Sequence, residues 1–279
     1  MIVTGLVRSP RRRTYLMCPP KNFVVEYAIN AWMDTTVPVD TDLAVKQWDV
    51  LRDTVTDLGH DVHVLEPLDG LPDMVFAANG AFSVDGVVYG AQFRYPQRSA
   101  EAAAHRAFYD GRPGEWRFVP PTMINEGEGD FAYVPGAYGG LILAGHGFRT
   151  EPAAHTEAQE ALSRPVISLH LVDPRFYHLD TALAALDDEN VIYYPAAFSP
   201  ASQAILRQLF PNAVIATETD AVGFGLNLVS DGYNILLNAE CSALAGRLEA
   251  LGYRPILIDL SELKKGGGSI KCVMAELRA

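Results

Sequence analysis

One local pattern recurs five times along the 279 residues: a helical stretch, a short turn and a β-rich apolar run. The first helix is predicted over 42–58, where apolar residues three and four positions apart share one face: Trp48, Leu51, Val55 and Leu58. Gly59 is a typical helix end, and the alternating residues after it predict a strand from about residue 60. Such a repeat constrains the fold strongly, because repeated units must bury their apolar faces against each other.

The other four copies keep the same order. Helices are predicted over 100–111, 155–164, 199–211 and 241–252, and strands begin after them near residues 115, 165, 212 and 253. Counted from residue 60, the strand starts are separated by 55, 50, 47 and 41 residues. In the fourth copy, Ser199 suits the N-cap and Pro200 suits the first helical position, so the start of this helix is well defined.

Hairpins are predicted between the copies. Asp85-Gly86 separates two β-rich runs, which is a strong signal for a tight turn, and paired runs also occupy 131–145 and 226–238. Each unit therefore has the order strand, strand, helix, strand. We expect an α/β fold in which five pseudo-symmetric ββαβ units surround a central axis and form one domain over 1–279. An ordinary α/β sandwich is the alternative.

The composition limits the class of protein. Hydrophobic residues make up 49% of the chain, enough for a large core, and the net charge is −12 with a pI near 5.0. A chain this acidic is a poor general binder of nucleic acid or anionic membranes, and no run approaches the roughly 20 apolar residues of a membrane helix. Three widely spaced cysteines make neither a disulfide framework nor a metal-binding spacing, which favours a cytoplasmic protein.

Cys272 is the first candidate for chemistry. It follows three glycines, Gly266 to Gly268, in the segment KKGGGSIKC. Glycines let the backbone approach a ligand closely, and exposed N–H groups can lower the pKa of a nearby thiol, whose thiolate is the nucleophile. The alternative is an inert cysteine in a surface loop before a buried last strand. Cys18 and Cys241 are interpreted as packing residues, Cys241 on the apolar face of the last helix.

Three further segments carry polar groups. In FYHLDTAL, His178 and Asp180 would point the same way if they lie on a strand, and a histidine beside a carboxylate can serve as a general acid or base. The segment INEGEGD places carboxylates among glycines, an arrangement typical of a solvated turn: Glu126, Glu128 and Asp130. In LPDMVFAANGAF, Asp73 and Asn79 flank an apolar run, which alone indicates a turn, an edge strand and a turn.

A metal site is the alternative use of these groups. Four of them could supply nitrogen and oxygen ligands: His178, Asp180, Glu126 and Glu128. This alternative would leave Cys272 without a role, so we expect no metal.

The order of PDMVFAANGAF, EGEGD, HLDT and GGGSIKC resembles the pentein superfamily of guanidine-modifying enzymes. That resemblance implies a fivefold ββαβ propeller, in agreement with the repeat. The opening LMCPPKNFVVEYAINAWMD is similar to that of the ornithine-producing arginine dihydrolases, and the likeness extends from about residue 15 to residue 276.

The resemblance implies roles for the candidate residues. Asp180 and Glu126 would bind the guanidinium nitrogens, and the backbone at Gly268 would lie close to the substrate. Cys272 would attack the central carbon to form a covalent thiouronium. His178 would protonate the departing ammonia or amine and then activate water, so no cofactor is expected.

The remaining candidates would hold the rest of the substrate. Arg98 and Arg149 are candidates to bind its α-carboxylate, with surface charge as the alternative. Asn30 could receive the α-amino group, and Asp73 is a further binding candidate. The segment 19–34 is a candidate lid because it is loop-like and contains Asn30.

Two departures from the family pattern bear on the substrate. Arginine deiminases and dimethylargininases commonly have an aspartate where this chain has Asn79, and a neutral amide could keep citrulline bound for a second hydrolysis. The motif EGEGD is one residue longer than the deiminase motif, which leaves open whether Glu126 or Glu128 faces the substrate.

The expected function is therefore hydrolysis of L-arginine to ornithine, ammonia and carbon dioxide. The alternative is a dimethylargininase that gives citrulline and dimethylamine. Further alternatives are an arginine deiminase or citrulline hydrolase, an amidinotransferase, and a non-enzymatic ribosome-binding propeller. The expected partner is a small-molecule substrate, with neither nucleic acid nor membrane. The sequence leaves the oligomeric state open, a homo-oligomer included.

Overall fold

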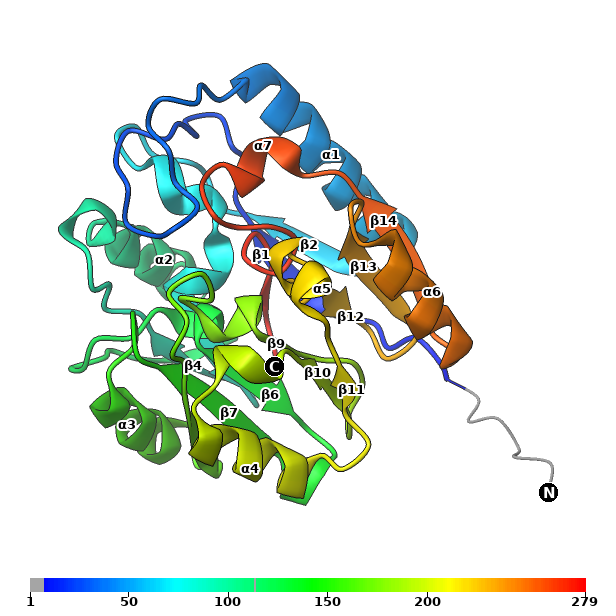
Figure 1. Ribbon diagram of the computed structural model, residues 1–279. Coiled ribbons are helices and arrows are strands. Elements are labelled where there is room, and N and C mark those ends of the chain that lie inside the picture. The colour runs from blue at the N-terminus through cyan, green and yellow to red at the C-terminus, as the bar shows by residue number, and fades with distance from the viewer. Residues whose placement is uncertain (1–7, 113) are drawn as a thin grey trace.

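Five three-stranded sheets surround a common axis in the computed structural model, which describes residues 8–112 and 114–279 (Figure 1). Residues 1–7 and 113, which are included in the predicted domain, lie outside the described residues. Each sheet contains one antiparallel pair and one parallel pair of strands. The parallel partner is reached through a helix, because two parallel strands cannot be joined by a tight turn.

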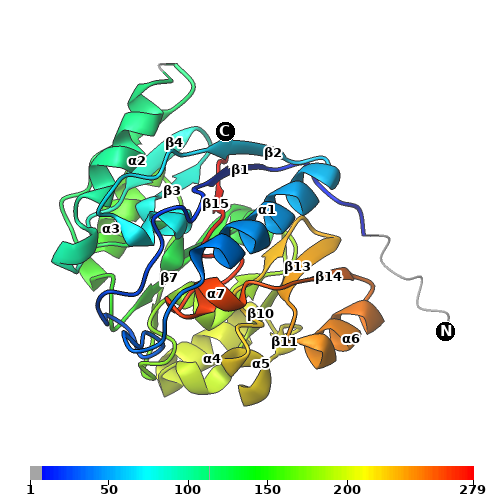
Figure 2. The same ribbon diagram turned by 90° about the horizontal axis from the view of Figure 1, so that it is seen from above.

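The first unit combines both ends of the chain. Strand β1 (Thr14–Met17) leads into helix α1 (Thr41–Asp57) and then to β2 (Asp61–Val64), which pairs parallel with β1. The last strand, β15 (Ala275–Glu276), pairs antiparallel with β1 and closes the ring (Figure 2).

The other four units are continuous in sequence. Their elements are β3 (Ala81–Val84), β4 (Val87–Gly90), α2 (Glu101–Asp110) and β5 (Arg117–Val119); β6 (Phe131–Val134), β7 (Leu141–His146), α3 (Pro152–Leu162) and β8 (Val166–His170); β9 (Leu183–Ala185), β10 (Val191–Tyr193), α4 (Pro200–Leu209) and β11 (Val214–Ile215); and β12 (Val229–Ser230), β13 (Asn234–Asn238), α6 (Ser242–Ala250) and β14 (Arg254–Ile258). The five unit helices lie outside the strands (Figure 1). The predicted fivefold ββαβ architecture is confirmed, and the sandwich alternative is wrong.

Local signals explain the element boundaries. Asp40 caps α1 by accepting a hydrogen bond from Leu43 N at 2.9 Å, and Ser199 caps α4 in the same way. Asp85 and Gly86 both have positive φ, 49° and 74°, as the tight turn between β3 and β4 requires. Helix α3 begins at Pro152, earlier than predicted, because proline is well suited to the first helical turn.

The core lies between the sheets and the helices. Trp48, Leu51 and Val55 of α1 are buried and belong to the same apolar cluster as Tyr15 and Met274. Burying each side chain of this size contributes about 2 kcal/mol, so the amphipathic face of α1 holds this helix against the closing strands.

Two short segments differ from the sequence expectation, and the surroundings of Cys18 agree with it. The run that includes Asp73 and Asn79 is not an edge strand but two buried 3₁₀ helices, η1 (Pro72–Val75) and η2 (Ala77–Gly80). Cys241 is not on the apolar face of its helix but at the N-cap of α6, and the last helix is the short α7 (Ser261–Lys264). Cys18 is fully buried, and burial raises the pKa of its thiol to about 12, in agreement with a packing role.

A buried turn precedes the first strand of every unit. Helix η2 precedes β3, η4 (Gly127–Gly129) precedes β6, and η6 (Leu179–Thr181) precedes β9. The segments 224–228 and 269–274 occupy the same position before β12 and β15. Adjacent turns touch: η4 contacts η2 and η6, and Ala78 N donates to Cys272 O at 3.0 Å. The ring therefore brings five distant segments together at its axis.

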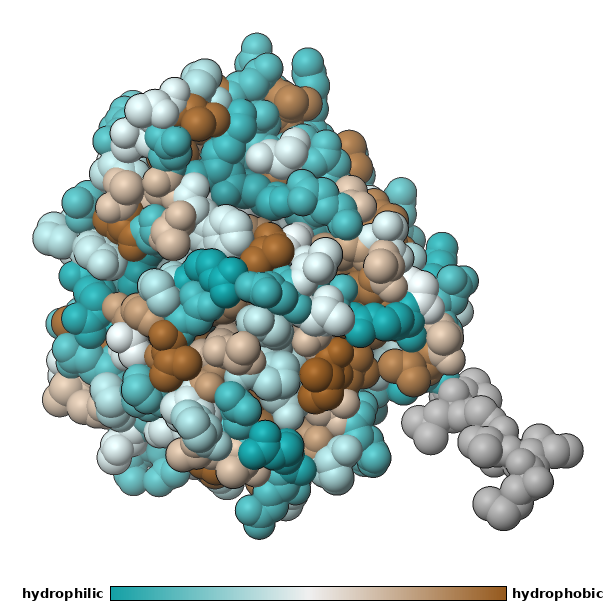
Figure 3. Space-filling model, viewed as in Figure 1, coloured by the Kyte–Doolittle hydropathy of each residue, from teal (hydrophilic) through white to brown (hydrophobic). Residues whose placement is uncertain are grey.

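The outer surface is mixed. On the face seen in Figure 1, hydrophobic and hydrophilic residues alternate in small groups (Figure 3). Among the described residues, no helix combines the length and the apolar character needed to cross a membrane.

Gly127 offers a test of how tightly the axial turns are packed. Its φ is 53°, and a Cβ there would lie 2.6 Å from Ala81 O and 2.8 Å from Ala78 O. We expect Gly127→Ala to lower the free energy of unfolding by about 2 to 4 kcal/mol, because strain and overlap with backbone add together.

Gly139→Ala is the matched control, since Gly139 also has a positive φ, 76°, but nothing lies near its added Cβ. It should cost only about 1 kcal/mol. Urea unfolding of both variants measures the difference, and equal losses would contradict the close packing.

Candidate active site

Cys272 lies in the axial turn before β15, with only 2% of its surface exposed. Its thiol donates to Asp180 Oδ2 at 3.1 Å, and Asn227 Nδ2 donates to its sulfur at 3.1 Å. The structure therefore places Cys272 in contact with Asp180, and the alternative of a surface loop is wrong.

The glycines before Cys272 are required by packing. A Cβ on Gly268 would lie 2.4 Å from Phe76 Cε1, and one on Gly266 would lie 2.9 Å from Phe23 Cε2. Two aromatic rings thus press directly against the backbone of this loop. The backbone at Gly268 also lies beside Cys272, whose Cβ would be 3.1 Å from the added atom.

His178 pairs with Glu126 rather than with Asp180. Its Nε2 lies 2.7 Å from Glu126 Oε2, and Arg149 Nη1 donates to the same oxygen at 2.7 Å. All three side chains are at least 98% buried. The expectation that His178 and Asp180 share one face of a strand is wrong, because Asp180 lies in η6 and His178 immediately precedes it.

Glu126 and Glu128 point to different partners, because the positive φ of Gly127 turns the backbone between them. Glu126 joins His178, whereas Glu128 forms ion pairs with Lys271 and Arg278. Both carboxylates are buried, so the expected solvated turn is wrong. The four residues of the metal alternative are therefore not gathered, and among the described residues no group of three His, Cys, Asp or Glu side chains is arranged for a metal ion.

Arg98 is buried and holds Asn79. Its Nη1 donates to Asn79 Oδ1 at 2.7 Å, and its Nε and Nη2 donate to Glu101 at 2.9 and 2.8 Å. A guanidinium has no acceptor, so the Asn79 oxygen must face Arg98 and the amide nitrogen must point away. The surface-charge alternative is wrong for Arg98 and for Arg149, which are 3% and 2% exposed.

Among the buried polar atoms without a hydrogen-bond partner in the described residues, four belong to the candidate site residues: Asp73 Oδ1, Asn79 Nδ2, His178 Nδ1 and Asp180 Oδ1. Two of them lie against the same side of Gly129, because a Cβ on that residue would lie 2.5 Å from Asn79 Nδ2 and 3.1 Å from His178 Nδ1. Buried polar atoms without partners are costly, which is typical of a site built to receive a polar ligand.

The segment 19–34 is tied by hydrogen bonds to four other segments of the chain. Tyr27 OH donates to Asp73 Oδ2 at 2.9 Å, and Ile29 O accepts from Arg149 Nη2 at 2.9 Å. Asn30 Nδ2 donates to Gly266 O at 3.1 Å, and Trp32 Nε1 donates to Arg175 O at 2.7 Å. These bonds hold the segment predicted as a lid against the body of the molecule.

The site favours a neutral thiol in the absence of a cation. Burial raises the pKa of Cys272 well above its ordinary value, and the Asp180 carboxylate raises it further. Burial also raises the pKa of Asp180 to about 7. Burial alone would raise the pKa of Glu126, but Arg149 and His178 hold it well below its usual range. A negatively charged acceptor cluster beside a protonated thiol suits a cationic ligand.

Asn227 was missed by sequence reasoning. It is fully buried, its Oδ1 accepts from Ser269 N at 3.1 Å and Cys272 N at 3.2 Å, and its Nδ2 also donates to Asp180 O at 3.2 Å. One amide thus ties the loop of the thiol to the turn of the carboxylate. Its place directly before β12, equivalent to that of Asn79 before β3, was the signal that could have identified it.

No protein-family profile matches the chain. A dimethylarginine dimethylaminohydrolase from Mycobacterium tuberculosis is 49% identical over 97% of this chain and 87% of its own length. The bifunctional arginine dihydrolase/ornithine cyclodeaminase ArgZ from Synechocystis is 33% identical over 92% of this chain, which spans 37% of that protein. The crystal structure of the N-terminal domain of ArgZ superimposes with a TM-score of 0.90 at 31% identity, over 95% of this chain and 98% of that domain.

This chain belongs to the pentein superfamily of guanidine-modifying enzymes. Its named relatives are hydrolases of guanidino C–N bonds, and the chain is an enzyme of that class. Membership of the superfamily explains the ring of five units, and the hydrolase relatives argue against the amidinotransferase and ribosome-binding alternatives.

The raised thiol pKa gives a pH prediction. A folded-state pKa above the ordinary 9.0 means that Cys272 is protonated at neutral pH and becomes a thiolate only in alkaline solution. The thiolate's ultraviolet absorbance, taken as wild type minus Cys272→Ser across a pH titration, should therefore rise above pH 9.0. A thiolate signal at neutral pH in the ligand-free enzyme would contradict this electrostatic account.

Proposed function

We propose that this pentein hydrolyses dimethylated arginine to citrulline and dimethylamine, using Cys272 as the nucleophile. The contact of the Cys272 thiol with Asp180 carries the proposal, since it sets a nucleophile beside an acceptor for a guanidinium. The 49% identity with the dimethylarginine dimethylaminohydrolase supports the choice of substrate. The sequence motifs favoured arginine dihydrolysis, and this similarity supports the dimethylargininase alternative better.

In the proposed mechanism, the substrate guanidinium binds among Asp180, Glu126 and the thiol. A guanidinium carries up to five N–H donors and no acceptor. Asp180 Oδ1, which has no partner, is available to accept one of these hydrogen bonds. The positive charge also stabilises the thiolate, which compensates for the raised pKa of the free thiol. Asp73 Oδ1 is a second acceptor without a partner, and the other oxygen of Asp73 binds Tyr27 of the segment 19–34. We propose that Asp73 Oδ1 binds the α-amino group of the substrate.

The chemical steps follow from the partners of His178. The thiol proton passes to His178 as sulfur adds to the guanidinium carbon, and His178 then protonates dimethylamine as the C–N bond breaks. A covalent thiouronium remains. His178 next accepts a proton from water, the resulting hydroxide adds to the same carbon, and the C–S bond breaks to release citrulline and the thiol. The proton on His178 then leaves to the released dimethylamine or to solvent, which restores the neutral imidazole. Glu126 and Arg149 keep the imidazole in one orientation throughout.

The segment 19–34 has to open for the substrate to reach these groups. We propose that opening breaks the bonds of this segment to Arg149 and Asp73. Arg149 is then free to bind the α-carboxylate of the substrate, and Asp73 is free to bind its α-amino group. Arg149 and Asn30 stay candidates for these contacts. Arg98 is a less direct candidate, because Glu101 and Asn79 already occupy its guanidinium.

Arginine dihydrolysis is the second candidate, favoured by Asn79. Arg98 holds the Asn79 oxygen, so the amide presents N–H donors toward His178. A donor matches the ureido oxygen of citrulline and cannot accept from a guanidinium. Citrulline retained there could be hydrolysed again, to ornithine, ammonia and carbon dioxide. The likeness to the ArgZ domain supports this candidate.

Product analysis after separate incubation with dimethylarginine, arginine and citrulline tests the two candidates. Citrulline and dimethylamine from dimethylarginine alone are expected, whereas ornithine from arginine and from citrulline would replace the first candidate by the second. Cys272→Ser should reduce turnover of every substrate by at least about 1000-fold while the protein stays folded. Cys18→Ser is the control and should retain activity, since Cys18 packs in an apolar core cluster with Leu16 and Val88 and not against Asp180 or Asn227. Activity remaining in Cys272→Ser would refute the mechanism.

Asn79→Asp tests the role of the amide. The aspartate places a second acceptor where Asn79 presents N–H donors, so it should weaken any hydrolysis of citrulline by about 10-fold or more and leave the first hydrolysis less affected. The measured quantity is the ratio of ornithine to citrulline formed from arginine. An unchanged ratio in a variant that still forms ornithine would exclude Asn79 from the second step.

A further inference from the structure

Asn227 uses every hydrogen-bonding group of its side chain in the axial turn before β12. Its Oδ1 accepts from Ser269 N at 3.1 Å and from Cys272 N at 3.2 Å. Its Nδ2 donates to Asp180 O at 3.2 Å and to Cys272 Sγ at 3.1 Å. A primary amide offers two N–H donors and two acceptor lone pairs, so these bonds fill its capacity.

The four bonds fix which end of the amide faces the sulfur. Backbone N–H groups cannot accept a hydrogen bond, so the oxygen of Asn227 must face the nitrogens of Ser269 and Cys272. The opposite orientation would also turn the oxygen toward the carbonyl of Asp180. The amide N–H is therefore aimed at the sulfur before any substrate binds, and a donor held in place in this way needs no rearrangement when charge develops.

The other neighbours of the sulfur disfavour a negative charge. The Cys272 thiol donates to Asp180 Oδ2 at 3.1 Å, so a thiolate would face a carboxylate there. Burial and Asp180 raise the pKa of the thiol, whereas the hydrogen bond from Asn227 lowers it. Within residues 8–112 and 114–279, Asn227 is the one side chain that donates a hydrogen bond to this sulfur.

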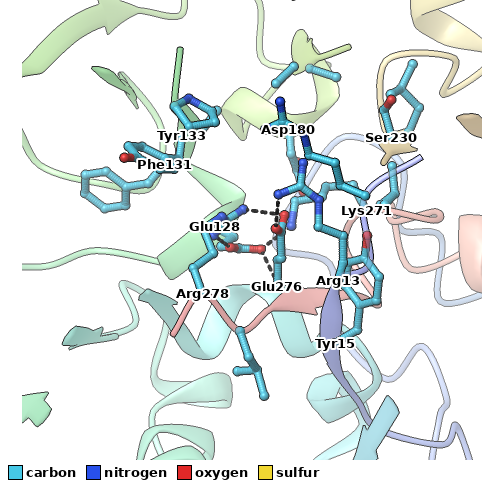
Figure 4. Close-up of a pocket in the computed structure, with 18 of the residues that line it drawn as sticks. Arg13, Tyr15, Glu128, Phe131, Tyr133, Asp180, Ser230, Lys271, Glu276 and Arg278 are labelled. Atoms are coloured by element: carbon cyan, nitrogen blue, oxygen red, sulfur yellow. Dashed lines mark hydrogen bonds and ion pairs between the residues drawn. The ribbon is translucent and has the colours of Figure 1, made fainter. Parts of the chain in front are cut away.

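Two cations near Asp180 are paired with a carboxylate instead. Lys271 precedes Cys272 in the chain, but it forms an ion pair with Glu128, and Arg278 pairs with the same carboxylate (Figure 4). The Nζ of Lys271 also donates to Met274 O at 2.9 Å. The sequence neighbour of the thiol thus does not donate to the sulfur, and the Asn227 amide does.

We propose that Asn227 is a catalytic residue, whose side-chain N–H stabilises the Cys272 sulfur while it carries negative charge. This role rests on the proposed function, in which Cys272 is the nucleophile. The S–H bond breaks as its proton passes to His178, and the electron pair left on the sulfur accepts from Asn227 until it forms the C–S bond. When that bond breaks, the pair returns to the sulfur, which takes up the hydroxyl proton of the adduct beside the same N–H.

Asn227→Asp separates this role from a structural one. The aspartate has the same shape and keeps an oxygen for the nitrogens of Ser269 and Cys272, but it replaces the amide NH₂ by a second oxygen. An ionised carboxylate repels the thiolate. A protonated carboxyl group has a single O–H for the two acceptors that the amide serves, Asp180 O and the sulfur.

We expect two measurements on Asn227→Asp to change together. The kcat for the substrate that the enzyme hydrolyses should fall by about 10- to 100-fold, with KM altered by less than about 3-fold. Alkylation of Cys272 by iodoacetamide, located by peptide mass spectrometry, should slow by about 10-fold between about pH 7 and about pH 10, because its rate follows the thiolate fraction. A normal alkylation rate in the folded variant would overturn the proposal even if kcat falls, since a structural role alone lowers kcat.

Asn238→Asp is the matched control. Asn238 is also buried, and its Nδ2 donates to Ser269 Oγ at 3.0 Å, so the same substitution acts on the same loop without touching the sulfur. It should keep kcat and the alkylation rate within about 3-fold of the wild type. Equal losses in the two variants would overturn the proposal, because they would assign the effect to a carboxylate near the loop.

NMR of protein with isotope-labelled asparagine covers the case in which Asn227→Asp does not fold. An asparagine side-chain N–H signal should shift in the wild type as Cys272 ionises above pH 9.0, and no such shift should occur in Cys272→Ser. The same pH response in both proteins would overturn the role of Asn227. Activity remaining in Cys272→Ser would instead refute the proposed function itself.

Discussion

The antiparallel pairing of β15 with β1 is the constraint on which the rest of the structure depends. Leu16 and Ala275 lie opposite each other, and this short ladder joins the two ends of the chain into a ring. Ring closure places the turn before β15, and with it Cys272, among the other four axial turns. The thiol is therefore positioned by a contact between segments about as far apart in sequence as the chain allows.

The side chains at the axis are buried, but their hydrogen bonds are not all satisfied, and this combination sets their chemistry. Cys272, Asp180 and His178 are removed from water, which disfavours the thiolate and leaves several acceptors without donors. In the proposed function, a bound guanidinium would supply both the missing donors and the missing positive charge. This proposal agrees with the guanidine-modifying family to which the chain belongs.

The two glutamates of the EGEGD motif have different partners and therefore lie in different environments. Gly127 directs Glu126 toward His178 and Glu128 toward Lys271, so that two carboxylates in one short motif serve different purposes. Glu126 lies beside the candidate acid–base His178, and Glu128 neutralises Lys271 and Arg278. Neither assignment follows from the motif itself, because the partners come from distant segments of the chain.

The sequence by itself determined the repeat, the five helices and the tight turn at Asp85, since periodicity, capping and turn chemistry act over a few residues, and it marked Cys272 only as a candidate nucleophile. Only the tertiary structure decided that Glu126, and not Asp180, partners His178, and that Asn227 binds the thiol. These pairs lie 52 and 45 positions apart. Their meeting depends on how five units close around one axis, and no local pattern in the chain records that geometry.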